Sequence, residues 1–140
     1  MTTTTDRVVI FDTTLRDGAQ TTGVDFSLPD KRRIIGVLDQ LGLDYIEGGY
    51  PGSNPTDSEL FAEKPKLATS RFTAFGMTKR AGRSVSNDTG FQALLQSAAD
   101  SVCLVAKSWD YHVRVALGIT NEENLQGIAE SIKAVVASDK

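Results

Sequence analysis

The sequence predicts an α/β protein in which parallel strands alternate with helices. Four short stretches rich in β-branched and aromatic residues are each followed by a segment with apolar residues at helical spacing. No hairpin signal joins any two of these stretches. Polar and charged side chains gather where the strands are expected to end. This combination is typical of βαβ units and a parallel sheet.

The first βα unit begins with "RVVIFDTTL", residues 7–15, whose β-branched and aromatic side chains predict a buried strand. A helix is predicted over residues 28–41. Ser27 and Asp30 form an S-x-x-D capping box at its start, and Gly42 ends it. The apolar face of this helix consists of Ile34, Ile35, Val37, Leu38 and Leu41.

Three further units follow along the chain. Strands are predicted over residues 44–50 ("DYIEGGY"), 71–78 ("RFTAFGMT") and 101–108 ("SVCLVAKS"). Helices are predicted near residues 57–63 and 91–98, and a last helix starts at a second capping box, Thr120 with Glu123. On one face this last helix carries Leu125, Ile128, Ala129, Ile132, Val135 and Val136.

Composition narrows the class of protein. The 140 residues suffice for one domain, and the net charge of −3 is too small to favour nucleic acid or a membrane surface as partner. The single cysteine excludes an internal disulfide framework, and no apolar run approaches the roughly 20 residues that span a bilayer. We therefore expect a soluble, cytoplasmic protein with a flexible tail over residues 1–7 and one domain over residues 8–140.

Polar side chains follow the predicted strands. Arg16 and Asp17 come after the first strand, Glu47 lies in the second, and lysine, arginine, serine and aspartate residues end the third and fourth. The carboxyl ends of parallel strands are where α/β proteins build their sites. A doubly wound sheet and a closed barrel both predict this placement, so the pattern leaves both architectures open.

Arg16 and Asp17 are adjacent and are followed by Gly18, which we expect to act as a hinge. A carboxylate at a strand end can bind a hard divalent cation, and a guanidinium beside it can stabilise a developing oxyanion. A plain ion pair at the rim, worth about 0–1 kcal/mol, is the alternative. Glu47 lies in a strand predicted to be buried, where a lone carboxylate is costly, so we expect Arg16 as its charge partner. A solvent-facing Glu47 is the alternative.

Several common types of site have no motif in this sequence. There is no glycine-rich phosphate-binding fingerprint and no G-x-S-x-G nucleophile elbow. His112 is the only histidine, and a lone histidine is more often structural or exposed than catalytic. The loop with Lys79, Arg80 and Arg83 could attract a phosphorylated cofactor, although a solvated loop explains it equally simply.

Four stretches resemble one known superfamily. "DTTLRDGAQ" is similar to the signature of the acyltransferases and lyases related to isopropylmalate synthase and 3-hydroxy-3-methylglutaryl-CoA lyase. "LDYIEGGYPGSNPTD", "FTAFGMTKR" and "KSWDYHVRVALGIT" resemble the citramalate synthase branch, whereas isopropylmalate synthases more usually have I-E-V-G-F-P in the second strand. The resemblance extends over nearly the whole chain.

The resemblance implies a TIM barrel with its active site at the C-terminal ends of the strands. In such a site Asp17 would be a metal ligand, Arg16 would steady an enolate oxygen, and Glu47 would hold Arg16 or a metal-bound water. Gln20 would contact the substrate or the metal-bound water, and His112 would contact the substrate. The implied metal is magnesium or manganese, or zinc as in some members, and acetyl-CoA is the implied co-substrate. The reaction would condense acetyl-CoA with an α-keto acid, pyruvate in the branch that serves isoleucine biosynthesis, and hydrolyse the thioester.

The sequence departs from the superfamily in one respect. It has no H-x-H motif, which supplies two further metal ligands in other members. A TIM barrel typically takes about 250 residues, so four βα units correspond to the first half of one. We expect such a half barrel to be inactive alone and to form a homo-oligomer or require the missing half, because its edge strands and inner face would be uncovered.

Three other functions stay open at this point. The enzyme could be an isopropylmalate or homocitrate synthase, which differs in the size of its keto-acid pocket. It could be a lyase that cleaves a hydroxy-acyl-CoA with the same arginine and metal. The chain could also be a non-catalytic half-barrel subunit.

Overall fold

The computed structural model describes residues 7–140, so nearly all of the expected tail over residues 1–7 lies outside the described part. The strands are β1 (Phe11–Asp12), β2 (Tyr45–Gly49), β3 (Arg71–Met77) and β4 (Ser101–Val105). The α-helices are α1 (Leu28–Gln40), α2 (Pro55–Leu60), α3 (Thr89–Gln96), α4 (Asp110–His112) and α5 (Asn121–Val136). Shorter helical turns are η1 (Gly18–Gln20), η2 (Val85–Asn87) and the π-helix η3 (Val113–Leu117).

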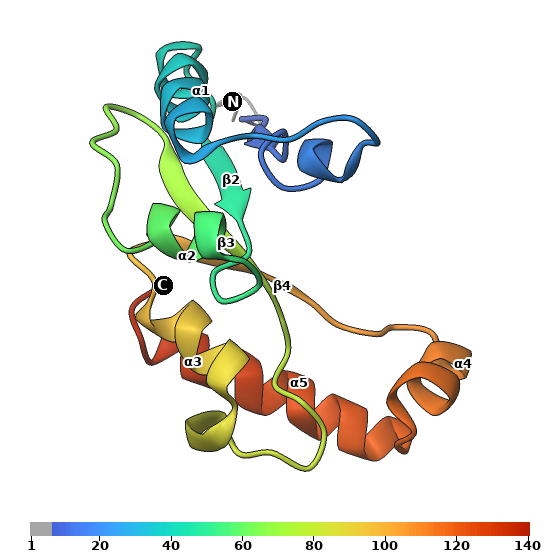
Figure 1. Ribbon diagram of the computed structural model, residues 1–140. Coiled ribbons are helices and arrows are strands. Elements are labelled where there is room, and N and C mark those ends of the chain that lie inside the picture. Colours follow the sequence, from blue (N-terminus) through green and yellow to red (C-terminus); the bar gives the residue numbers. More distant parts are fainter. Residues whose placement is uncertain (1–6) are drawn as a thin grey trace, which may run out of the picture.

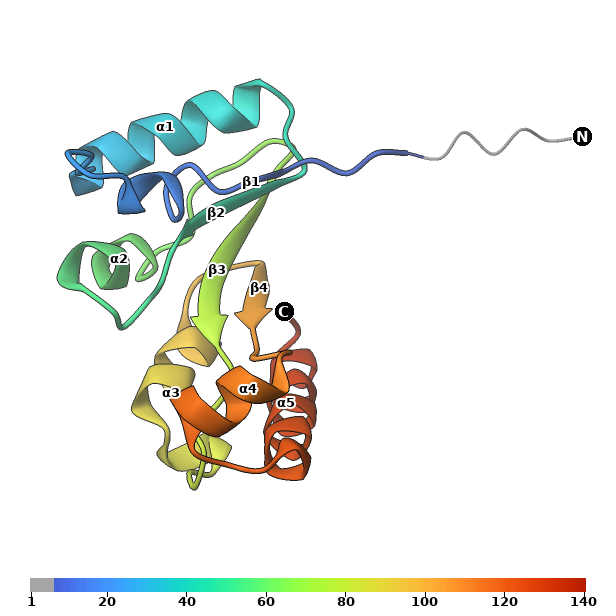
Figure 2. The same cartoon turned by 90° about the vertical axis from the view of Figure 1, so that its right-hand side faces the viewer.

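All four strands are parallel, and their order in the sheet, β1-β2-β3-β4, is their order in the chain. Figure 1 labels β2, β3 and β4, and Figure 2 labels all four strands. The sheet is strongly twisted, with α1 and α2 beside β1 and β2, and α3 and α5 beside β3 and β4 (Figure 2). The predicted α/β class of parallel βα units is therefore confirmed, and the arrangement is consistent with the first half of a TIM barrel. None of the helices described here is long and apolar enough to cross a membrane.

Both predicted capping boxes are present. At the start of α1 the Asp30 amide donates to Ser27 Oγ over 3.3 Å, and the Ser27 amide donates to Asp30 Oδ2 over 3.2 Å. At the start of α5 the Glu123 amide donates to Thr120 Oγ1 over 3.1 Å, with the reverse bond at 2.8 Å. Gly42 follows α1 with a φ of +79°, as expected for a residue that ends a helix.

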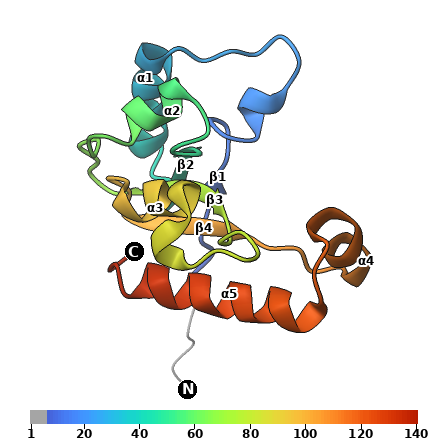
Figure 3. The same cartoon turned by 60° about the horizontal axis from the view of Figure 1, so that its bottom comes forward.

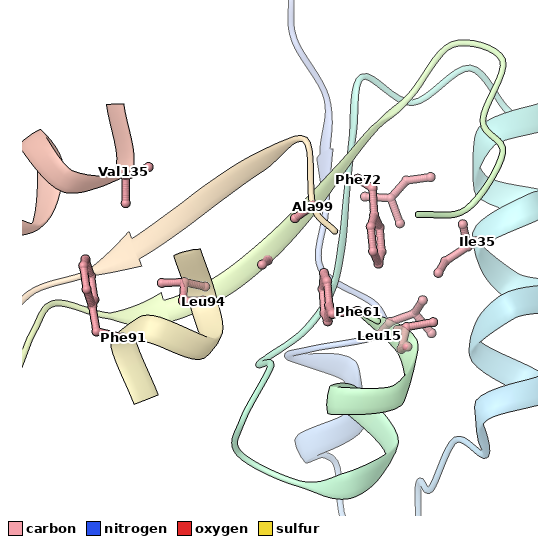
Figure 4. Packing of buried hydrophobic residues seen from close by; sticks show 11 residues of the cluster. Leu15, Ile35, Phe61, Phe72, Phe91, Leu94, Ala99 and Val135 are labelled. Atoms are coloured by element: carbon pink, nitrogen blue, oxygen red, sulfur yellow. The ribbon is translucent and has the colours of Figure 1, made fainter. Parts of the chain in front are cut away.

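The hydrophobic core lies between one face of the sheet and the helices (Figure 4). Phe72 of β3 is fully buried and stacks on Phe61, with ring centroids 4.5 Å apart. Gly48 of β2 brings the backbone close to this pair, since a Cβ built there would lie 2.5 Å from the Phe72 ring. Further core residues are Leu15, Ile35, Ile46, Leu60, Ala74, Phe91, Leu94, Ala99 and Val135.

The first strand is much shorter than predicted. Strand pairing is confined to Phe11–Asp12, while Val8, Val9 and Ile10 are exposed. In the described part of the chain β1 is bonded on one side alone, by β2, and the backbone leaves the sheet soon after Asp12. The expectation of a buried strand over residues 7–15 is therefore wrong at both ends.

Helix α5 packs through only one edge of its apolar stripe. Val135 is buried, whereas Leu125, Ile132 and Val136 are exposed. Two polar contacts fix the rotation of the helix: Asn124 Nδ2 donates to the Lys107 carbonyl over 2.9 Å, and Ser131 Oγ accepts from the Lys79 amide over 2.9 Å. These contacts turn the polar edge toward the ends of β3 and β4, which leaves part of the apolar stripe in solvent.

Candidate functional site

A tight turn follows β1 and carries the first two candidate residues. The carbonyl of Thr13 accepts hydrogen bonds from the amides of Arg16, Asp17 and Gly18, at 3.1, 2.8 and 3.2 Å. Leu15, inside the turn, is completely buried and anchors it to the core. Gly18 takes part in this turn but does not have a positive φ, so its backbone conformation does not require a glycine. The hydrogen bonds to the Thr13 carbonyl and the buried Leu15 fix the backbone of the turn, and so fix where the side chains of Arg16 and Asp17 begin.

Arg16, Asp17 and Glu47 line one cavity of about 520 Å³ at the C-terminal ends of the strands. Glu47 comes from the middle of β2, and the other two come from the turn after β1. The remaining walls include Tyr50, Phe75, Cys103 and Lys107.

The guanidinium of Arg16 is held in a defined place. Its central carbon lies 3.6 Å from the centroid of the Phe75 ring, a cation–π contact. The guanidinium also forms an ion pair with the Asp17 carboxylate. The side chains of Arg16 and Asp17 are 22% and 57% exposed, so this pair sits at the rim of the cavity. The direct ion pair of Arg16 is with Asp17 and not with Glu47, although the charge of Arg16 still acts on Glu47, as a charge partner should.

Glu47 is the enclosed carboxylate of this cavity, with 2% of its surface exposed. Burial raises its pKa above the ordinary value, while a hydrogen bond from the Cys103 thiol and the charge of Arg16 act in the opposite direction. Burial also raises the pKa of the Cys103 thiol, and the nearby Glu47 charge adds to this effect. Glu47 is therefore more easily protonated than a surface glutamate, and can exchange a proton nearer to neutral pH.

The other two candidates lie elsewhere. Gln20, in η1, lines a neighbouring cavity of about 480 Å³ that also touches Arg16. His112 is exposed on α4, where its ring packs against Trp109 with centroids 4.6 Å apart. Helix α4 projects from the side of the molecule (Figure 3). The structure thus groups Arg16, Asp17 and Glu47 in one cavity, places Gln20 beside Arg16 in the neighbouring cavity, and places His112 in neither.

The basic loop after β3 borders a third cavity, of about 580 Å³. Its charges have internal partners: Lys79 Nζ lies 3.0 Å from a carboxylate oxygen of Glu130, and Arg80 Nε lies 3.8 Å from Asp88. The loop therefore has less unpaired positive charge than its sequence indicates.

The described residues do not form a complete metal site. Among residues 7–140, no three histidine, cysteine, aspartate or glutamate side chains are placed to hold one ion. Asp17 offers one carboxylate at the rim of the cavity, a hard oxygen ligand of the type that divalent cations prefer. Any metal bound here needs ligands beyond this set.

Some residues of the site were not singled out from the sequence. Phe75 and Met77 on β3, and Cys103 and Val105 on β4, share the cavity because they alternate along their strands. This period of two was visible in the sequence. Lys31, which is buried beneath the Arg16 turn, had no such signal.

Comparison with known proteins agrees with this geometry. The sequence matches the HMGL-like family over residues 7–139. The chain belongs to the HMGL-like family. Its relatives include (R)-citramalate synthases of Aquifex aeolicus and Sulfolobus acidocaldarius, each 46% identical over 130 residues, or 91% of this chain. A 2-isopropylmalate synthase of Sulfolobus acidocaldarius is 35% identical over 129 residues. The predicted resemblance to the citramalate synthase branch is confirmed.

These HMGL-like relatives are much longer proteins. The chain covers 25% of each of the two citramalate synthases and 31% of the isopropylmalate synthase. It therefore spans about a quarter of the length of the citramalate synthases that it matches.

Proposed function

We propose that this chain supplies part of the active site of an acetyl-CoA-dependent acyltransferase, and that its α-keto acid is pyruvate. The observation that carries the proposal is the shared cavity of Arg16, Asp17 and Glu47 in a chain 46% identical to (R)-citramalate synthase. The isopropylmalate synthase relative, at 35% identity, supports acyl transfer to a larger α-keto acid as the second candidate.

In the proposed reaction, the methyl group of acetyl-CoA loses a proton and its carbon bonds to the keto carbon of pyruvate. The keto oxygen gains a proton, and water then cleaves the thioester and releases free CoA. Both the enolate and the alkoxide carry negative charge on oxygen, which fixed donors stabilise best. Arg16 would meet this charge, because its guanidinium is held against Phe75 and cannot swing freely. Glu47, with its raised pKa, would hold or pass a proton inside the cavity.

A divalent metal, either magnesium or manganese with zinc as an alternative, would polarise the keto group when bound. We assign Asp17 as one of its ligands because its carboxylate lies at the rim of the same cavity. The described residues do not complete the ligand set, so the other ligands would come from outside this cavity. We therefore propose that the 140-residue chain alone releases no CoA.

A chimera tests this function. The matching 130 residues of the Aquifex aeolicus enzyme are replaced by this chain, and CoA release from acetyl-CoA is measured with pyruvate and with 2-oxoisovalerate. Pyruvate-dependent release supports the proposal, and a preference for 2-oxoisovalerate supports the second candidate. A folded chimera that releases no CoA with either acid would contradict both.

Two substitutions in the chimera test the assigned residues. Arg16→Gln is expected to lower kcat about 10²–10³-fold, the range found on removing one oxyanion donor. Asp17→Ala is expected to weaken metal binding in calorimetry. The controls are Arg32→Gln and Glu63→Gln, at exposed positions outside the cavity. Unchanged kcat in Arg16→Gln, or unchanged metal affinity in Asp17→Ala, would remove that residue from its role.

A further inference from the structure

A buried ion pair lies directly beneath the turn that carries Arg16. Lys31 of α1 and Asp57 of α2 are 4% and 7% exposed, and Lys31 Nζ lies 2.5 Å from Asp57 Oδ1. Burying two charges has a large desolvation cost, and replacing such a pair by apolar residues is often neutral for stability or even stabilising. Stability alone therefore does not explain why these two charges are placed here.

The other contacts of Lys31 lead to both strands of the site. Its ammonium also donates to the carbonyl of Leu15 over 3.0 Å and to the carbonyl of Gly48 over 2.9 Å. An ammonium has three protons, so these bonds and the ion pair use all of them. Leu15 directly precedes Arg16, and Gly48 directly follows Glu47. One buried side chain thus ties together the backbone beside two residues of the candidate site.

Asp57 extends the network to the end of β2. Its Oδ2 accepts a hydrogen bond from the Tyr50 amide over 2.9 Å and another from Asn54 Nδ2 over 3.1 Å. Gly49 has a φ of +144°, and a Cβ built there would lie 2.5 Å from Asp57 Oδ2. The chain therefore wraps closely around this carboxylate, and the pairing of β2 with β3 shifts register between Glu47 and Gly49.

Taking the proposed function as its basis, we propose that Lys31 and Asp57 are positioning residues of the site. They act through the backbone: Lys31 fixes the turn from which Arg16 reaches Phe75 and the strand end that presents Glu47. Asp57 holds Lys31 in place and shapes the chain from Gly49 to Tyr50. Neither side chain needs to touch a substrate.

The test separates positioning from stability in the 140-residue chain. The variants are Lys31→Met, Asp57→Leu and the double variant, with Lys64→Met as control because Lys64 pairs with Asp100 at the surface. Stability is measured as the urea midpoint of unfolding. The position of Arg16 is measured by the NMR chemical shift of its side-chain Nε–H, which the Phe75 ring current displaces in the native arrangement.

Each single substitution is expected to lower the urea midpoint, because it leaves one buried charge unpaired. The double variant is expected to have a urea midpoint close to that of the wild type. Its Arg16 Nε–H resonance should nevertheless remain shifted from the native position toward the random-coil position. Lys64→Met should change neither quantity. A double variant with a native Arg16 resonance would overturn the proposal and leave a purely structural pair.

Asp57→Asn serves if the double variant does not fold. It keeps the size of the side chain and an oxygen for the Tyr50 amide, but removes the charge that holds Lys31. A displaced Arg16 resonance in this variant supports positioning, and an unchanged one overturns it. None of these readouts uses metal or substrate, so the proposed acyl transfer can fail without changing them.

Discussion

Glu47 is almost completely enclosed in a cavity that also contains the Asp17 carboxylate. Burial raises its pKa, so the folded protein binds a proton at Glu47 more readily than the unfolded chain does. The cost of holding this carboxylate ionised is absent below the unfolded pKa of about 4.3 and complete above the higher folded pKa. Stability therefore falls as pH rises between these two values. Such a cost is typical of a group placed for chemistry rather than for folding.

Glu47→Gln is accordingly expected to stabilise the protein at pH 7. We expect a gain of about 0.5–2 kcal/mol in the free energy of unfolding, the range of common single stabilising substitutions. The gain in stability should shrink as pH is lowered toward 4, because the protonated Glu47 of the wild type is then uncharged, like the glutamine. Urea unfolding at several pH values measures it, with Glu63→Gln as the surface control. A loss of stability at pH 7 would contradict the assignment.

Some residues of the candidate site could be predicted from the sequence and others could not. Arg16, Asp17 and Glu47 were found because they follow or lie in strands whose ends must meet at one edge. The ion-pair partner of Arg16 could not be predicted in this way. The choice between Asp17 and Glu47 depends on a turn made by hydrogen bonds to the Thr13 carbonyl. Lys31 was missed because a lysine is ordinarily exposed, and only the arrangement of three distant backbone and side-chain acceptors buries it.

At the scale of elements, Asp39 joins the end of α1 to the loop that leads into β3. Its carboxylate accepts hydrogen bonds from the amides of Ala68, Thr69 and Ser70, at 2.7, 3.0 and 2.8 Å. These bonds lower the pKa of Asp39 strongly. The stabilisation is therefore complete above the unfolded pKa of about 3.9 and is lost as pH falls toward the folded value.

Asp39→Ala is expected to lower the free energy of unfolding at pH 7 by about 1.5–3 kcal/mol, the range for hydrogen bonds to a charged group. The difference from wild type should narrow below pH 4, because Asp39 takes up a proton in the unfolded chain while the folded carboxylate stays ionised. Urea unfolding at pH 7 and pH 3 provides the comparison, and Asp25→Ala is the exposed control. An equal difference at both pH values would show that the charge of Asp39 is not responsible.

Helix α5 offers a matched pair of substitutions. Ile132 is 50% exposed and Val135 is 7% exposed, although both belong to the predicted apolar face. Ile132→Lys should change the free energy of unfolding by no more than about 0.5 kcal/mol. Val135→Ala should lower it by about 1.5–3 kcal/mol through the lost methyl groups. Thermal unfolding of the two variants checks this order, and a larger loss for Ile132→Lys would contradict the rotation of the helix seen here.

The elements also differ in how much of them the sequence reveals. The capping boxes at Ser27 and Thr120 were predictable because each is complete within four residues. The rotation of α5 was not, because it depends on Ser131 accepting from the Lys79 amide, 52 residues earlier in the chain. The length of β1 was not predictable either. β-Branched residues favour the extended conformation, but a strand also needs a neighbouring strand to form hydrogen bonds with.

At the scale of the whole molecule, the two faces of the sheet have different roles. One face carries Ile46, Phe72 and Ala74 into the core beneath the helices. The opposite face carries Glu47 and Cys103 toward the candidate site. Because side chains alternate along each strand, one short sheet serves folding on one side and the proposed chemistry on the other.

The order of the strands in the sheet affects where the molecule begins to unfold. Strand β3 is bonded on both sides, whereas β1 pairs with β2 only at Phe11 and Asp12. Each βα unit packs mainly against the units that precede and follow it in the chain. Local unfolding should therefore start at β1 and spread through β2 toward β3. Native-state hydrogen exchange is expected to find the slowest amides in β3 and fast ones at Phe11, and uniform protection would contradict this. The turn that holds Arg16 and Asp17 would then be the first part of the site to be released, and the last to be secured as the chain folds.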